Sequence, residues 1–333
     1  SQGLEPRPTL LLTNADSLID FLNRFRDRLE VHYLMAQVSA EQLERLADKA
    51  EFQEICDELG IATIPTRVLD FSDSGADGAD MRAPLPWSYP VVAKAANTAE
   101  YARVDFPGKR KVFFLETEAG YSRLVDALEH AGFAGRFLVQ GLVPGDDTAQ
   151  RSITAYRTST GEVTLTCAAQ VLLGEHTPDA LGRPAAMVTG HHSGILTEAA
   201  RFLDHVDYVG FANFDLKVDP RSGREYFLEL NPRLGRNNYY VTAAGGRYPE
   251  HIVADLVDQA PLTPREVTAE ALYSILPLAL VKKYVTQPGL RAALARAKKR
   301  GVANPFIYRP ERAWMKAYGI VSGLNFVRKY RKV

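Results

Sequence analysis

Phe211–Gly235 reads FANFDLKVDPRSGREYFLELNPRLG. Two short apolar segments flank the turn-forming residues PRSG, and this pattern is typical of a β-hairpin. Folding the chain at that turn predicts that Asp215 lies opposite Glu229 and that Lys217 lies opposite Phe227. The hairpin therefore brings two acidic side chains together, because strand side chains alternate between faces and paired positions share one.

Asn231 lies two residues after Glu229 and is predicted to share that face. Both acids lie in apolar runs, FANFDL and YFLELN, which predicts that they are at least half buried. Carboxylate and amide oxygens are hard ligands suited to Mg²⁺ or Mn²⁺ that bridges phosphates. The sequence therefore predicts a metal site formed by Asp215, Glu229 and Asn231, with Arg233 available for a phosphate or a developing anion. A surface hairpin with solvated acids is the alternative.

Length and composition indicate an ordinary globular protein of two or three domains. The chain has 333 residues, 46% of them hydrophobic and 24% charged. Its two cysteines, Cys56 and Cys167, form no disulfide framework and have no metal-ligand spacing, which suits a reducing cytoplasm. No apolar run approaches about 20 residues and the first residues do not resemble a signal peptide, so we expect a cytoplasmic protein.

Charge is distributed unevenly along the chain. Residues 281–333 contain 14 Lys and Arg and one acid, Glu311, so this segment carries +13 and the remainder −13. Such a basic tail can meet a membrane surface, a nucleic acid, a nucleotide-bearing substrate or the acidic body of the same protein. No nucleic-acid-binding motif is present, so we expect no nucleic-acid partner.

The N-terminal part predicts half of an α/β unit followed by a long helix. Residues 8–40 read as an apolar strand, an amphipathic helix and a second apolar strand. Ser39–Leu59 is predicted to form one helix with Ser39 as its N-cap, and Gly60 ends it.

The hairpin also carries a resemblance to a known family. An acid on one strand followed by Glu-x-Asn-Pro-Arg on the next resembles the metal-binding strands of the ATP-grasp superfamily. The longer run ELNPRLGRNNYYVTAAGG, from Glu229 to Gly246, is most similar to the branch of carboxylate–amine ligases typified by the D-aspartate ligases of peptidoglycan synthesis. The resemblance implies an α/β (α+β) fold in which ATP lies between two α+β subdomains.

The resemblance also implies a domain order. We expect a partial Rossmann-like unit at 1–40, small nucleotide-binding subdomains at 41–139, a large subdomain with the metal hairpin at 140–262 and a basic helical extension at 263–333. ATP-grasp enzymes usually have a complete domain at the first position, which implies that residue 1 is internal to a longer protein.

Two lysines match the nucleotide-contacting lysines of the superfamily in order and spacing. Lys49 lies on a predicted helix, and Lys94 ends the predicted strand PVVAK. Lysines on both sides of a triphosphate supply fixed positive charge where negative charge develops. The region between Lys94 and the next strand lacks the glycine run of many relatives, so Lys109 or Lys111 is expected to contribute to phosphate binding.

The segment VQGLVPGDD resembles the linker between the two halves of an ATP site. The resemblance implies that the backbone groups of Gln140, Leu142 and Val143 contact the adenine edge, with a polar side chain near its amino group. It also implies that Asp147, rather than Asp146, binds the ribose hydroxyls. An ordinary Pro-Gly turn with exposed acids is the alternative.

Arginines and a histidine run are the candidates for substrate binding. Arg151 and Arg236 could hold a substrate carboxylate, since arginine binds carboxylates in a bidentate manner. The run TGHHSGI is predicted to form a substrate loop that uses His191. No further Cys or His is spaced to complete a zinc site with this run.

The reaction that the resemblance implies has two steps. ATP, held by Lys49, Lys94 and Mg²⁺ or Mn²⁺, phosphorylates a carboxylate, and an amine then attacks the acyl phosphate; Lys94 and Arg233 are the expected catalytic residues. The implied acid is D-aspartate, activated at its side chain, and the implied amine is the lysine side chain of a nucleotide-linked cell-wall peptide. An ATP-grasp ligase for another acid or amine, a small-molecule kinase, and a nucleotide-binding module without turnover are the alternatives. Peripheral membrane contact through the tail and a homodimer stay open.

Overall fold

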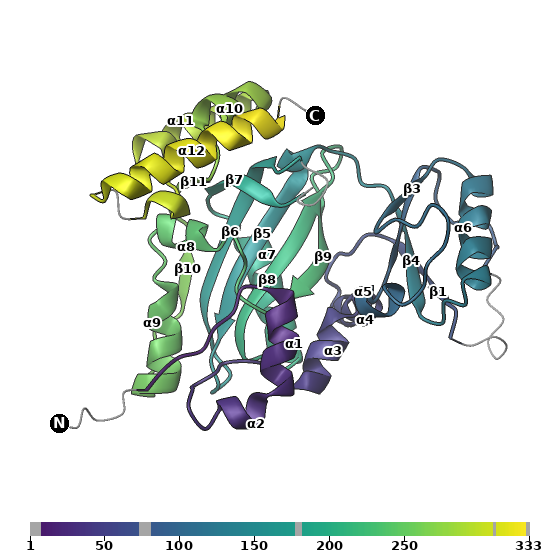
Figure 1. Cartoon of the computed structure of the whole chain (residues 1–333), viewed down its shortest axis with the longest axis horizontal. Coiled ribbons are helices and arrows are strands. Elements are labelled where there is room, and N and C mark those ends of the chain that lie inside the picture. Colours follow the sequence, from purple (N-terminus) through teal and green to yellow (C-terminus); the bar gives the residue numbers. More distant parts are fainter. Residues whose placement is uncertain (1–7, 73–80, 177–181, 309–310, 331–333) are drawn as a thin grey trace.

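The computed structural model describes residues 8–72, 81–176, 182–308 and 311–330, so the first seven residues of the expected N-terminal unit lie outside it. The described chain is a mixed α+β protein built on two sheets (Figure 1). A four-stranded sheet lies at one end of the molecule, and a larger eight-stranded sheet forms its centre. The predicted α+β fold class is confirmed.

The small sheet has the strand order β1-β4-β2-β3, and each pair of adjacent strands is antiparallel. Helix α6 packs on it through buried side chains such as Tyr121 and Val125, which contact Val91 and Phe137 of the sheet. Thr117 caps the start of α6 by accepting a hydrogen bond from the amide of Gly120. The elements are β1 (Thr66–Asp70), β2 (Val91–Ala95), α5 (Thr98–Tyr101), β3 (Phe113–Leu115), α6 (Glu118–His130) and β4 (Arg136–Gly141).

The large sheet has the order β12-β11-β7-β6-β5-β8-β9, and β10 pairs with β6. Its central strands β5 to β9 are antiparallel, and β8 and β9 form the predicted hairpin. The strands are β5 (Gln150–Arg157), β6 (Val163–Gly174), β7 (Pro184–Thr189), β8 (Gly210–Val218), β9 (Glu225–Asn231), β10 (Arg265–Val267), β11 (Leu272–Ser274) and β12 (Val302–Ala303).

Apolar side chains cover both faces of the large sheet. Helix α7 (Ser193–His205) packs on one face, where Phe202 contacts Phe214 of β8. The opposite face packs in part against α8 (Tyr239–Ala243) and α9 (Tyr248–Val253), and Tyr240 is fully buried there. The remaining short turns of helix are η1 (Asp147–Ala149), η3 (Ala254–Asp258) and η4 (Pro305–Ile307).

The described N-terminal residues form two helices and one isolated bridge, where the sequence predicts two strands around a helix. Leu10 and Leu34 form a parallel bridge, and α1 (Asp16–Arg24) and α2 (Arg26–Leu29) lie between them in the chain. Gly210 approaches the backbone of Ala36 at a φ of +100°, so a side chain at this position would strike the Ala36 carbonyl. This contact joins the N-terminal unit to the start of β8.

The expected single helix from Ser39 to Leu59 is wrong, because it is broken at Asp48. The structure has α3 (Ala40–Ala47) and α4 (Lys49–Leu59), and Asp48 lies between them in an extended conformation. The Asp48 carboxylate accepts hydrogen bonds from the first turn of α4, which an uninterrupted helix would not allow. The N-cap at Ser39 and the left-handed Gly60 that ends α4 are confirmed.

The C-terminal residues form three helices against the far edge of the large sheet (Figure 1). Phe326 and Tyr330 of the last helix are buried with Leu172 and Val188 of β6 and β7. Strands β10, β11 and β12 come from this segment, so the expected boundary at residue 262 cuts through the large sheet. The helices are α10 (Leu278–Tyr284), α11 (Pro288–Lys299) and α12 (Ala313–Tyr330).

Candidate active site

The hairpin of β8 and β9 brings the two acids together as predicted. Asp215 pairs with Glu229 in the register of these strands. Beyond this pair the register shifts, so Leu216 pairs with Phe227 and Lys217 with Tyr226. The predicted pairing of Lys217 with Phe227 is therefore wrong, because an irregularity in β9 inserts one residue after the acid pair.

Hydrogen bonds hold the Asp215 carboxylate in place. Asn231 donates to it at 3.0 Å, Ser152 at 3.3 Å and Asn213 at 3.4 Å. Arg233 donates in turn to the amide oxygen of Asn231 at 3.1 Å. The structure thus gathers Asp215, Asn231 and Arg233 into one connected polar group.

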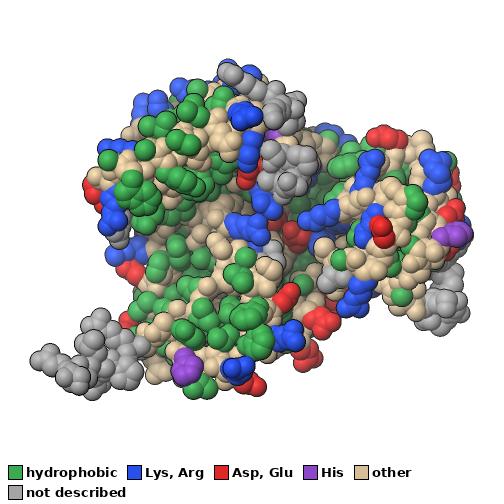
Figure 2. All heavy atoms as spheres, viewed as in Figure 1, with side chains coloured by type: hydrophobic (Ala, Val, Ile, Leu, Met, Phe, Trp, Pro, Cys, Tyr) green, Lys and Arg blue, Asp and Glu red, His purple; other side chains and the backbone are tan. Residues whose placement is uncertain are grey.

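Positive charge faces the acids from the small subdomain and from α4. The Lys49 ammonium lies 3.4 Å from a carboxylate oxygen of Glu229. The charges of Lys49, Lys94 and Lys111 outweigh the opposing effect of burial and lower the pKa of Glu229. Burial, together with the neighbouring charges of Lys49 and Lys111, lowers the pKa of Lys94 to about 8. Basic and acidic side chains gather in the hollow between the two lobes (Figure 2).

Asp215 differs from Glu229 in its electrostatic surroundings. Burial, and then the charge of Glu229, raise the pKa of Asp215 to about 7, against the lowering effects of Asn231, Arg233 and Ser152. The negative charge of the pair is therefore not fully compensated at Asp215. A bound divalent cation would supply the missing positive charge. Among the described residues no group of three His, Cys, Asp or Glu could hold a metal, so a third protein ligand would have to be an amide such as Asn231.

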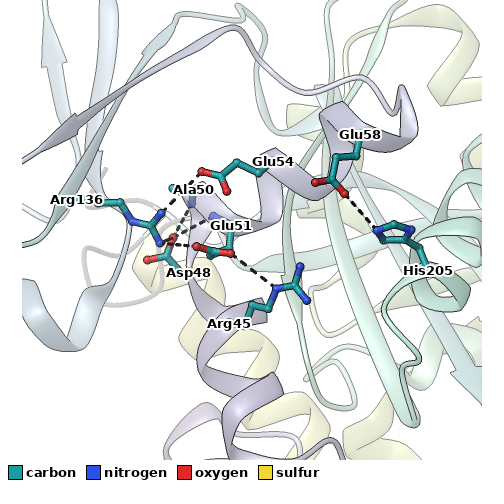
Figure 3. A network of polar contacts seen from close by, with 8 residues as sticks. All are labelled: Arg45, Asp48, Ala50, Glu51, Glu54, Glu58, Arg136 and His205. Carbon is teal, nitrogen blue, oxygen red and sulfur yellow. Dashed lines mark hydrogen bonds and ion pairs between the residues drawn. The ribbon is translucent and has the colours of Figure 1, made fainter. Parts of the chain in front are cut away.

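A network of hydrogen bonds and ion pairs surrounds the start of α4 (Figure 3). Asp48 accepts from the amide of Ala50 at 2.8 Å and lies 3.1 Å from a guanidinium nitrogen of Arg136 on β4. Glu51 lies at the same distance from that nitrogen. Because Lys49 is the first residue of α4, this network fixes where its side chain begins relative to the small sheet.

Asp48→Ala should test that positioning. We expect a loss of about 1–2 kcal/mol of unfolding free energy, since an N-cap is worth about that much, and a severalfold weaker ATP affinity. Urea unfolding and calorimetric titration with ATP measure the two effects. Asp57→Ala, at an exposed position of the same helix, serves as the matched control. An Asp48→Ala protein that loses stability but binds ATP normally would show that the cap does not position Lys49.

The linker after β4 leaves backbone groups available. Leu142 and Val143 follow β4, and their backbone N–H and C=O groups bond to none of the described residues. Gln140 lies within β4, and its side chain donates to the Thr66 hydroxyl at 2.8 Å. Leu142 and Val143 thus keep the free backbone groups expected for an adenine edge, whereas the Gln140 side chain is engaged within the small sheet.

Asp147 contacts the end of β6. Its carboxylate accepts hydrogen bonds from the amide of Gly174 at 2.8 Å and from His176 at 2.9 Å. The neighbouring Asp146 caps the short η1 helix. Both contacts use the same carboxylate oxygen, so Asp147 fastens the linker to the end of β6, and its expected role at the ribose stays a prediction.

Arg151 does not join the acid group. It pairs with Leu216 in the sheet while Ser152 pairs with Asp215, and neighbouring strand residues point to opposite faces. Its guanidinium forms an ion pair with Glu225 and donates to His192 at 3.2 Å. The Arg151 side chain therefore points to the face opposite the Asp215 carboxylate, and its expected role in holding a substrate carboxylate stays a prediction.

The other substrate candidates are exposed. His191 is 71% exposed and lies 3.5 Å from Glu266 of β10, so it is the adjacent His192 that contacts Arg151. Arg236 is exposed and forms no ion pair with the described residues. Neither residue lies in the polar group around Asp215.

The sequence did not point to three residues that contribute to this site: Asn213, Asp48 and Arg136. Asn213 shares the Asp215 face two residues earlier on β8, which strand alternation alone could have indicated. Asp48 and Arg136 act through a contact between segments almost 90 residues apart, for which the sequence carries no signal. Lys109 and Lys111 are the two lysines expected to contribute to phosphate binding. Lys111 faces the acids, whereas Lys109 lies over the ring of Tyr101 and donates to the Val104 carbonyl.

Comparisons with known proteins agree with this geometry. Residues 156–248 match the family described as carbamoyl-phosphate synthase L chain, ATP binding domain. A D-aspartate ligase of Enterococcus faecium (strain Aus0004) is 30% identical over 252 residues, which is 76% of this chain and 59% of the relative. The chain thus spans about three fifths of that relative's length.

Several solved structures share the fold at low sequence identity. The biotin carboxylase domain of the Hydrogenobacter thermophilus 2-oxoglutarate carboxylase, in complex with MgADP, has a TM-score of 0.58 at 13% identity and covers 78% of this chain and 56% of that chain. Biotin carboxylase from Campylobacter jejuni has a TM-score of 0.56 at 16% identity with the same coverage. The N5-carboxyaminoimidazole ribonucleotide synthetase of Thermus thermophilus has a TM-score of 0.50 at 21% identity and covers 76% of this chain and 62% of that chain. With its two sheets and the acid pair on β8 and β9, the chain has the ATP-grasp fold.

Proposed function

We propose that this protein is an ATP-dependent carboxylate–amine ligase. It would activate a carboxylate as an acyl phosphate and join it to an amine, with release of ADP and phosphate. The observation that carries this proposal is the placement of Asp215 and Glu229 opposite Lys49 and Lys94. Like-charged acids that face fixed cations across a hollow are suited to bind a polyphosphate with a divalent cation.

In this proposal some residues bind ATP and others neutralise the negative charge that develops during the reaction. Lys49 and Lys94 would bind the phosphates, and Leu142 and Val143 would meet the adenine edge through their free backbone groups. Arg233, which donates to Asn231, lies where a developing anion needs a positive charge. No side-chain nucleophile is required, because binding and orientation of the two substrates supply most of the rate enhancement.

Asp215, Glu229 and Asn231 fit a hard divalent cation, since they offer carboxylate and amide oxygens and leave Asp215 short of positive charge. A bound Mg²⁺ would neutralise phosphate charge during transfer. In the first step a carboxylate oxygen of the substrate attacks the γ-phosphorus and ADP leaves. In the second step the amine nitrogen attacks the acyl carbon, phosphate leaves and the amine loses a proton.

The substrates we propose follow from the relative. D-Aspartate is the acid, activated at its side-chain carboxylate, because the D-aspartate ligase of Enterococcus faecium is 30% identical to this chain. The amine is the lysine side chain of a nucleotide-linked cell-wall peptide. The basic C-terminal segment is compatible with such an anionic acceptor.

Formation of hydroxamate tests the reaction class. We expect the protein with ATP, Mg²⁺ and hydroxylamine to form a hydroxamate from D-aspartate, and to a much smaller extent from L-aspartate, D-glutamate or succinate. Hydroxylamine intercepts an acyl phosphate without the natural amine, and the ferric complex of the product is coloured. Omission of ATP or of Mg²⁺ serves as the control.

The result also separates this proposal from the alternatives. A signal with another acid would keep the ligase and replace the substrate. ATP consumption that yields a stable phosphorylated product, with no hydroxamate across the panel, would identify a kinase instead. ATP binding without turnover, with the peptide acceptor present as well, would identify a nucleotide-binding module.

A further inference from the structure

Helix α12 presents an apolar face to solvent. Five of its large hydrophobic side chains are between 54% and 66% exposed: Trp314, Tyr318, Ile320, Val321 and Leu324. With 3.6 residues per turn they share the side of the helix opposite its buried residues. Hydrophobic side chains gather over this helix on the surface of the C-terminal lobe (Figure 2). Contiguous exposed apolar surface of this kind marks an interaction site.

The opposite face of α12 is firmly packed. Met315, Phe326 and Tyr330 are each less than 10% exposed, and Phe326 and Tyr330 belong to the core formed with β6 and β7. The ring of Tyr330 also contacts that of His176 in a tilted arrangement, with centroids 4.8 Å apart. The helix is therefore anchored on one side and presents the other as a fixed surface.

The segment that carries this face is strongly basic. Helices α10, α11 and α12 contain no acidic residue, and residues 281–333 as a whole carry 14 Lys and Arg against one acid. Lys316 and Arg328 of α12 are exposed, as are Lys282 and Lys283 of α10. Basic side chains lie at the margins of the apolar surface (Figure 2).

We infer that the outer face of α12 binds the surface of a membrane that contains anionic lipids. Tryptophan and tyrosine favour the interface between headgroups and acyl chains, aliphatic side chains insert below it, and lysine and arginine attract anionic headgroups. An anionic lipid surface offers negative charge to all of these cations at once, whereas a protein partner would need acidic side chains placed around the whole apolar face. None of the described helices is long and apolar enough to cross a bilayer, so the contact is an interfacial one.

This inference is independent of the proposed ligase activity, because the face lies on α12 and not at the acid pair. The inference places the protein at an anionic membrane surface, where its local concentration is raised. Two kinds of interaction contribute, insertion of apolar side chains and attraction of charge, and each can be removed separately.

The first experiment is flotation with vesicles. We expect the full chain to float with vesicles of phosphatidylcholine and phosphatidylglycerol, to bind phosphatidylcholine alone at least about tenfold more weakly, and to be released as salt rises, since screening weakens surface charge attraction. Replacing the apolar face by Trp314→Ser, Val321→Ser and Leu324→Ser should weaken binding to the anionic vesicles at least about tenfold.

A matched variant removes as much exposed apolar surface elsewhere. Leu18→Ser, Phe21→Ser and Val31→Ser change residues that are 51%, 52% and 74% exposed on the N-terminal unit, and this protein should bind vesicles normally. Unchanged thermal unfolding of both variants shows that the fold is intact. Lys316→Gln with Arg328→Gln should weaken binding to anionic vesicles and leave binding to neutral ones unchanged.

Fluorescence of Trp314 gives a second readout that does not depend on the triple variant. The chain has two tryptophans, so Trp87→Phe leaves Trp314 as the only one. Anionic vesicles should shift its emission to shorter wavelength, and brominated lipids should quench it. The inference is overturned by a wild-type protein that does not bind anionic vesicles, by a serine variant that binds as well as wild type, or by a dimer that the serine variant abolishes without any vesicle binding.

Discussion

Asp215→Asn is expected to lower the rate of ligation by more than about 100-fold, because changes in groups that only support metal ligands already cost 10–100-fold. The substitution keeps the shape of the side chain and the hydrogen bonds from Ser152 and Asn231 can persist in part. It removes one of the two negative charges that would hold the cation. The loss should therefore lie in the rate and in the Mg²⁺ requirement, and not in the fold.

The stability of the metal-free Asp215→Asn protein should stay the same or increase. Burial and the charge of Glu229 raise the pKa of Asp215 to about 7, so at pH 8 the ionised group destabilises the metal-free fold relative to an unfolded chain in which it ionises freely. Removing that charge should leave the melting temperature of the metal-free protein unchanged or higher. Addition of Mg²⁺ and ATP should raise the melting temperature of the wild type but not of the variant.

Asp20→Asn, at an exposed position on α1, serves as the control for a general effect of removing an acid. Melting curves with and without Mg²⁺ and ATP, together with product formation, measure the outcome. An Asp215→Asn protein that turns over at the normal rate would remove Asp215 from the metal site. A variant that is inactive and also unfolded would show that the carboxylate supports the fold instead.

The acid pair could be predicted from the sequence because its determinants are local. A turn of PRSG with apolar runs on both sides defines the hairpin, and strand alternation then assigns Asp215 and Glu229 to one face. The one-residue irregularity in β9 could not be predicted, because nothing in the local sequence marks where the register shifts. The error at Lys217 begins at that point.

Residues whose roles depend on tertiary contacts were harder to assign. Arg151 directly precedes Ser152, but which of the two faces the acids depends on the pairing of β5 with β8. Asp147 is attractive as a ribose ligand in isolation, yet the amide of Gly174 and the ring of His176 engage its carboxylate. The sequence alone does not reveal that β6 ends beside the linker.

Phe214→Ala should strongly destabilise the protein. Phe214 is fully buried, and its ring meets those of Phe202 and Phe227 edge-on at centroid distances of 5.5 and 5.7 Å. Truncation removes the ring that fills the space between α7 and the sheet. We expect a loss of about 3–5 kcal/mol of unfolding free energy, measured by urea denaturation.

Phe114→Ala on β3 is the matched control, because that ring is 64% exposed and its loss should change stability by less than about 0.5 kcal/mol. Phe214 and Asp215 are neighbours that point to opposite faces of β8. Below its melting temperature the Phe214→Ala protein should therefore retain the Mg²⁺ and ATP response that Asp215→Asn loses. If Phe214→Ala instead abolished that response in folded protein, the core under α7 would set the position of the acid pair, and the two faces of the strand could not be treated as independent.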